Sequence, residues 1–102
     1  MSVLSSDPYY RTLNIEITPT AVDEIVEGTP IAWDSGNTKY AKYAAGLTPV
    51  GIALRAVPSI SASPLAILVQ GRADRKIVEA AFGNTLTDAQ IVAFCNNGVV
   101  IA

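Results

Sequence analysis

The sequence contains few side chains that could carry out chemistry. It has 102 residues and no histidine, which excludes catalytic triads, histidine-based acid–base catalysis and most zinc or iron sites. Neither a GxxxxGK[ST] nor a GxGxxG pattern occurs, so phosphate-binding loops of those two kinds are excluded as well. We therefore predict that the protein is not an enzyme and has no catalytic residue, cofactor or metal site.

Asp23, Glu24 and Glu27 come nearest to a carboxylate cluster. A catalytic or metal-binding pair is one interpretation, but exposed carboxylates near a turn are far commoner, and we predict a solvated face. Cys95 is the only cysteine, so it cannot form an intrachain disulfide. It lies in the apolar stretch 91–95, and free cysteine usually behaves as a small hydrophobe. We predict a buried thiol, with a reactive thiol as the alternative.

Two further groups of residues are candidates for binding. Arg72, Asp74, Arg75 and Lys76 follow a glycine, and we predict a solvated rim or helix cap there, with a phosphate site or a salt bridge to a partner as alternatives. Aromatic rings suit both sugar stacking and protein interfaces, and interface anchoring is the commoner use. The second group is Trp33, Tyr40, Tyr43 and Ile52, and we predict that these residues form a subunit interface or part of the core.

The composition indicates one soluble domain with a partner. Half of the residues are hydrophobic and 16% are charged, against about 25% charged in a usual soluble domain, so we expect apolar surface that meets another protein. A net charge of -2 argues against nucleic-acid binding. No apolar run approaches the roughly 18 residues of a membrane span, and no secretion signal is indicated. We expect synthesis in the cytoplasm.

The beginning of the chain is predicted to be an extended N-terminal arm, residues 1–18, ahead of a compact domain, residues 19–102. Residues 1–12 lack periodicity, whereas residues 13–18 alternate apolar and polar side chains, the pattern of a strand with one covered face. Such an arm can add a strand to a partner's sheet. The alternative is that residues 13–18 form an ordinary strand of the domain's own sheet. The predicted partner-binding residues of the arm are Tyr9, Tyr10, Leu13, Ile15 and Ile17.

Turn residues and short apolar runs predict the rest of the sheet. Residues 31–33 and 38–43 flank a turn-rich group and suggest a hairpin. The apolar segments 49–57 and 65–69 are predicted core strands joined by a loop at residues 58–64. Glycines at 51 and 71 predict bulges or close backbone approaches.

Capping signals predict two short helices. Asp74 can cap a helix at residues 75–82 that ends at Gly83, with Ile77, Ala81 and Phe82 toward the core. Thr87 and Gln90 form a capping box for a second helix, in which Ile91 and Phe94 share a face. Asn97 and Gly98 close this helix, and a strand at residues 99–102 follows. The predicted fold class is α+β, mostly β: a small barrel- or sandwich-like domain with two short helices and an extended N-terminal arm.

The order of these features resembles the lambda-type head decoration proteins of tailed phages. The likeness covers residues 28–102 and rests on order and spacing. It is carried by Thr29-Pro30-Ile31-Ala32, the turn aspartate Asp34, Val50-Gly51-Ile52-Ala53, Gly71, Ala93-Phe94 and Val99-Val100-Ile101.

The resemblance implies a structural capsid decoration protein on the outer surface of the virion. Such a protein would bind the expanded head, cement neighbouring copies of the major capsid protein, and form a homotrimer. Nucleic acid and membrane are not among its predicted partners. The alternative function is a receptor- or carbohydrate-binding β module, or the base of a head fibre, on the virion surface.

Overall fold

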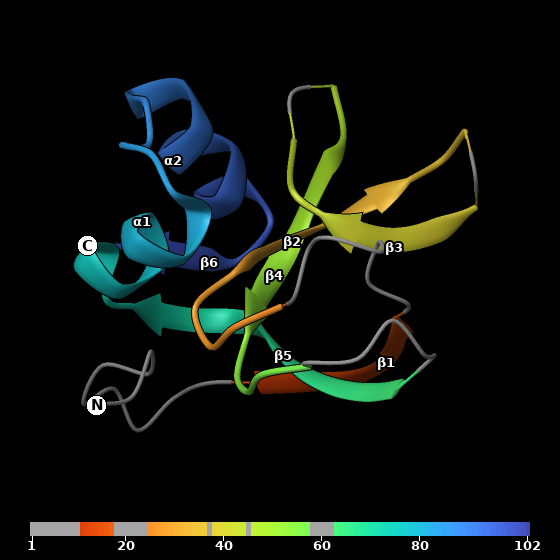
Figure 1. Ribbon diagram of the computed structural model, residues 1–102. Coiled ribbons are helices and arrows are strands. Elements are labelled where there is room, and N and C mark those ends of the chain that lie inside the picture. The colour runs from red at the N-terminus through yellow and green to blue at the C-terminus, as the bar shows by residue number, and fades with distance from the viewer. Residues whose placement is uncertain (1–10, 18–24, 37, 45, 58–62) are drawn as a thin grey trace.

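A computed structural model describes residues 11–17, 25–36, 38–44, 46–57 and 63–102. Within these residues the elements are β1 (Arg11–Ile17), β2 (Pro30–Asp34), β3 (Lys39–Lys42), β4 (Thr48–Ala53), β5 (Ser63–Ala73), α1 (Arg75–Phe82), α2 (Asp88–Asn96) and β6 (Val99–Ile101). The predicted fold class is confirmed, because the described chain is mostly strand with two short helices (Figure 1).

The described strands form one curled sheet with the order β1-β5-β4-β2-β3. Neighbouring strands in this order pair antiparallel. Strand β6 pairs in parallel with the last part of β5, from Gly71 to Ala73, whereas β4 pairs with β5 at Ile67 and Leu68. Figure 1 shows both helices on the β6 side of the sheet. The sheet therefore has one region that the helices cover and one concave face, inside its own curl, that is filled by core side chains.

Strands β4 and β5 divide the core into two hydrophobic clusters. Ile52 lies opposite Leu68 in the β4–β5 ladder, and both side chains pack with the helices around Phe94. The next pair, Ala53 and Ile67, belongs to the second cluster, inside the curl of the sheet. Successive side chains of a strand point to opposite faces, so each of these two strands contributes to both clusters.

The close crossing of β4 and β5 explains the predicted role of Gly51. A Cβ atom built on Gly51 would overlap the carbonyl oxygen of Leu68. This close approach is confirmed, because any side chain at position 51 would push the two strands apart. Gly71 was predicted just after a strand, but it lies inside β5 at φ +135°, where its N–H donates to the carbonyl of Gly98.

The hairpin prediction is confirmed by β2 and β3, in which Trp33 lies opposite Tyr40. The strand predicted at residues 49–57 is shorter, because β4 ends at Ala53 and only Val57 pairs again, as a single bridge to Ile25. The strand predicted at residues 65–69 is longer, because β1 and β6 extend its ladders at the two ends. Of the predicted loop 58–64, residues 58–62 lie outside the described residues, and positions 63 and 64 belong to β5.

Both predicted helices are confirmed with their caps. The Asp74 side chain accepts hydrogen bonds from the N–H groups of Lys76 and Ile77, and Gly83 ends α1 in the left-handed conformation. In α1, however, Val78 is the fully buried residue, whereas Ile77, Ala81 and Phe82 are half-buried. Thr87 and Gln90 form the capping box of α2, and Phe94 is buried. The predicted C-terminal strand is β6, over Val99–Ile101.

Strand β1 corrects the predicted extent of the N-terminal arm. Residues 11–17 pair antiparallel with β5 from Arg11 opposite Gln70 to Ile17 opposite Ser63. Ile15 and Ile17 are 6% and 2% exposed. Of the two readings of this alternating segment, the structure shows the domain's own strand, since two isoleucines gain full burial in its curl. Residues 1–10 and 18 lie outside the described residues.

Candidate functional site

The outer edge of β1 is the first candidate docking site. β1 stands at one end of the strand order and, among the described residues, pairs with β5 alone. Its seven residues include four exposed polar or charged side chains, those of Arg11, Thr12, Asn14 and Glu16. An edge strand presents unpaired backbone N–H and C=O groups, which can pair with a strand from another chain. This edge can therefore bind a partner by hydrogen bonding without any chemical step.

Burial of β1 changes what its predicted binding residues can do. Ile15 and Ile17 belong to the core cluster inside the curl, so their side chains cannot also contact a partner. Leu13 lies on the same strand and is 43% exposed. Tyr9 and Tyr10 lie outside the described residues. Of the predicted arm contacts within the structure, Leu13 alone keeps an accessible side chain.

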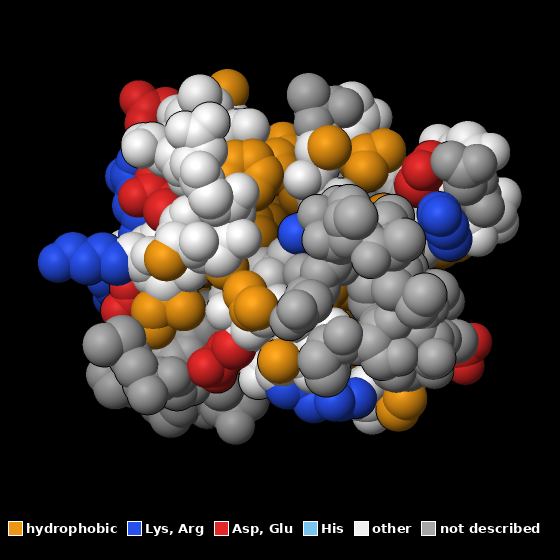
Figure 2. Space-filling model, in the orientation of Figure 1, with side chains coloured by type: hydrophobic (Ala, Val, Ile, Leu, Met, Phe, Trp, Pro, Cys, Tyr) orange, Lys and Arg blue, Asp and Glu red, His pale blue; other side chains and the backbone are white. Residues whose placement is uncertain are grey.

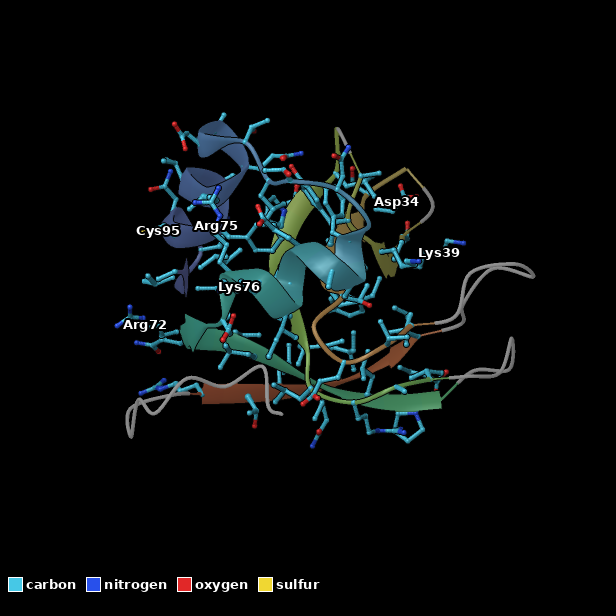
Figure 3. All side chains as sticks on the ribbon, turned by 60° about the vertical axis from the view of Figure 1, so that its left-hand side comes forward. Asp34, Lys39, Arg72, Arg75, Lys76 and Cys95 are labelled. Atoms are coloured by element: carbon cyan, nitrogen blue, oxygen red, sulfur yellow. The ribbon has the colours of Figure 1, made fainter. Side chains whose placement is uncertain are left out.

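The opposite edge of the sheet is less suited to pairing. Strand β3 has four residues and carries a lysine at each end, Lys39 and Lys42. Lysines on short edge strands are a common protection against pairing with other chains. Lys39 lies opposite Asp34 of β2, and Figure 3 shows both residues at the same end of the sheet. The longer β1 is thus the edge better suited to docking.

The aromatic residues divide between two environments. The rings of Trp33 and Tyr40 are 4.9 Å apart and nearly perpendicular, and both residues are partly buried. Tyr43 instead packs its ring against Phe82 and Phe94, beside the helices. The three residues do not form one flat platform for a sugar. Ile52, predicted with them, is fully buried in the core.

The predicted basic cluster is only partly committed to structural contacts. Asp74 caps α1, and Arg75 forms a 3.2 Å ion pair with Glu79 and also donates to the carbonyl of Leu86. The side chains of Arg72 and Lys76 are exposed and contact no described hydrogen-bonding partner. Figure 3 shows Arg72, Arg75 and Lys76 on the same side of the molecule. This arrangement matches the predicted helix cap and solvated rim.

Glu79 organises the connection between the two helices. One of its carboxylate oxygens accepts hydrogen bonds from the N–H of Leu86, at 2.8 Å, and from the Arg75 guanidinium. The bond from Leu86 is the largest of the effects that lower the pKa of Glu79, and Arg75 adds to it against a smaller opposing effect of burial. The ionised carboxylate is therefore the form that the fold prefers.

Cys95 is exposed, which overturns the predicted buried thiol. α2 lies on the outside of the domain and turns the neighbouring Phe94 inward, so a residue one position later faces away from the core. Figure 3 shows Cys95 at the end of the molecule that the helices form. Of the acidic residues considered at the start, Asp23 and Glu24 lie outside the described residues, and Glu27 is half-buried.

The described part of the chain contains no group of three or more acidic, cysteine or histidine residues that could hold a metal ion. Within the same residues, no helix is long and apolar enough to cross a membrane.

A second candidate surface was missed by the sequence analysis. A groove of about 420 Å³, the α1 groove, lies between α1 and the turn before β2. It is lined by Val26, Glu27, Lys76, Ile77, Ala80 and Ala81. Val26 is 43% exposed. Three other large apolar residues, Leu13, Val92 and Val100, are exposed by 43 to 55%. Hydrophobic side chains also reach the surface visible in Figure 2. No periodic pattern predicts the groove, because its two walls are about fifty residues apart in the sequence.

No protein-family model matches this chain, and a search of curated proteins finds no significant match.

Proposed function

We propose that this protein is a structural decoration protein of a tailed-phage capsid, which binds the outer surface of the expanded head and cements neighbouring major capsid subunits. It acts without catalysis, in the virion, and binds the major capsid protein and further copies of itself, with a homotrimer as the proposed assembly. The observation that carries the proposal is the edge strand β1, which is anchored in the core and leaves its outer backbone edge without a strand partner among the described residues.

An anchored edge strand suits a cementing role. The edge is already ordered by Ile15 and Ile17, so docking does not require the folding of a loose segment, which would cost about 1 to 2 kcal/mol of backbone entropy per residue. Pairing with a capsid strand would add hydrogen bonds and cover Leu13. Many such weak contacts, repeated over a shell, add up through effective concentration.

The order of elements supports the same proposal. The segments behind the resemblance to lambda-type decoration proteins become consecutive parts of one domain: Pro30 opens β2 and Asp34 ends it, and residues 50–53 lie in β4. Phe94 anchors α2 in the core, and Val99–Ile101 is the parallel strand β6.

Co-sedimentation tests the proposal directly. Purified protein is mixed with empty expanded heads built from the major capsid protein of the phage that encodes this chain. We expect binding that saturates at a fixed ratio to capsid subunits and raises the temperature at which the heads break. Absence of both effects would overturn the proposal.

A matched pair of variants tests the role of β1. Thr12→Lys places a lysine on the exposed edge strand, whereas Thr48→Lys makes the same change at an exposed position of β4, which pairs with β2. We expect Thr12→Lys to weaken head binding, because lysine on an edge disfavours strand pairing, and Thr48→Lys to bind like the parent. Equal binding by both variants would assign docking to another surface.

A further inference from the structure

The α1 groove carries two opposite charges that the domain leaves unused. Glu27 lies on the turn before β2, and Lys76 lies in the first turn of α1. Neither side chain has a hydrogen bond or ion pair with any described residue. Because the charges have opposite signs, the groove has no net charge, and a strongly acidic or strongly basic partner gains nothing from it.

The space between these charges is apolar and shallow. Ile77, Ala80 and Ala81 lie on one stripe of α1, because residues three and four apart share a helix face. The two alanines are short and leave room for a side chain from outside. Val26, at the other wall, is 43% exposed and can enter such a space in another molecule.

Gly28 sets the width of the groove. It adopts φ +95°, and a Cβ atom there would lie 2.8 Å from Cγ2 of Ile77. Glycine therefore allows the turn to approach α1 closely, while Val26, two residues before it, stays exposed. This backbone conformation strongly favours glycine, so the shape of the groove depends on this position.

We propose that the α1 groove is a self-association surface, on which a second copy of this chain packs about a two-fold axis. Val26 of each copy contacts Ala80 and Ala81 of the other, and Glu27 of each copy faces Lys76 of the other. A surface with an apolar centre, a projecting valine and one charge of each sign can complement itself, which is what a two-fold interface requires. The second copy also gives both unpaired charges a partner.

The contact is small, so the dimer is weak. Stable interfaces bury about 1,200 to 2,000 Å² in total, and six side chains per copy, two of them alanine, cover less. We therefore expect association that depends on protein concentration and weakens with added salt. This two-fold contact is separate from the threefold contact proposed for the capsid surface, and it goes beyond the proposed function.

Sedimentation equilibrium of the free 102-residue chain tests the inference. We expect the mass to rise with concentration from the 10.7 kDa of one chain to twice that value. Lys76→Glu and Glu27→Lys should each raise the dimer dissociation constant about tenfold, because a two-fold dimer contains two equivalent Glu27–Lys76 pairs and each substitution removes both. The double variant exchanges the charges and should restore the parent constant. Failure of the double variant to recover would overturn the assignment.

Valine variants supply the control. Val26→Asp should abolish the dimer, whereas Val92→Asp, at a valine of α2 that is 55% exposed, should leave it unchanged. Circular dichroism confirms that both variants are folded. A parent chain that stays monomeric, or one that forms only trimers insensitive to the charge variants, would overturn the inference. No heads are present in this assay, so its outcome is independent of the head-binding test.

Discussion

The carboxylate of Glu79 accepts a 2.8 Å hydrogen bond from the backbone N–H of Leu86, seven residues later. The same oxygen accepts from Arg75. The bond thereby closes the loop between α1 and α2 over the core cluster that contains Leu86 and Phe94. One acidic side chain thus holds the start of α1 and the segment before α2 together.

This contact predicts an acid-sensitive stability. The pKa of Glu79 is lowered in the fold, so its contribution is complete above the ordinary value of 4.5 and is lost as the pH falls from there through the lower folded pKa. Glu79→Gln should be less stable than the parent at neutral pH, and the difference should shrink on acidification. Chemical unfolding at several pH values measures this, and a constant difference would contradict it.

Deletions distinguish the part of the N-terminus that belongs to the fold. Removal of residues 1–18 takes away β1 with Ile15 and Ile17, and losing a buried isoleucine costs about 2 to 5 kcal/mol each. Because domains are stable by about 5 to 15 kcal/mol, this deletion should unfold the chain. Removal of residues 1–10 leaves every described element intact and should keep the cooperative unfolding transition. Thermal melts of both proteins provide the comparison.

Gly51→Ala should be strongly destabilising. The added methyl group would overlap the Leu68 carbonyl, a backbone atom that cannot move without separating β4 from β5. We expect a loss of about 3 kcal/mol. Gly36→Ala is the matched control, because Gly36 is exposed in the β2–β3 turn and a Cβ there meets only Oδ1 of Asp34 at 3.4 Å. Urea unfolding of the two variants should differ clearly, and similar midpoints would contradict the prediction.

Phe94 and Val92 provide a test within one helix. Phe94 is fully buried and its ring contacts Tyr43, whereas Val92 is 55% exposed. Phe94→Ala should cost about 3 to 5 kcal/mol of unfolding free energy. Val92→Ala should stay within about 0.5 kcal/mol of the parent. A comparable loss in both variants would mean that α2 packs differently on the sheet.

The edge-to-face contact of Trp33 with Tyr40 predicts a measurable coupling. A double-mutant cycle with Trp33→Leu and Tyr40→Leu should give an interaction energy of about 0.5 to 1.5 kcal/mol. Tyr43 in place of Tyr40 is the control, because its ring contacts Phe82 and Phe94 instead. Coupling of Trp33 to Tyr43 as strong as to Tyr40 would contradict the observed separation of the rings.

Local signals were sufficient for much of the fold. Asp74 and Gly83 predicted the two ends of α1, and Thr87 with Gln90 predicted the start of α2, because caps satisfy backbone groups within a few residues. The β2–β3 hairpin followed from its turn residues for the same reason. In each case the interacting groups are neighbours in the chain.

Contacts between distant segments required the tertiary structure. The alternation of apolar and polar residues in β1 shows that one face of the strand is buried. Only the pairing of β1 with β5 shows that this face is buried by the same domain and not by a partner. The exposure of Cys95 was mispredicted because α2 has apolar residues around most of its circumference, so its periodicity does not reveal the buried face. The sequence by itself determined the elements and the absence of histidine chemistry. Only the three-dimensional packing decided which strand edges and grooves remain open. Their exposure depends on contacts between segments that are about fifty residues apart in the sequence, such as residues 26–27 and α1.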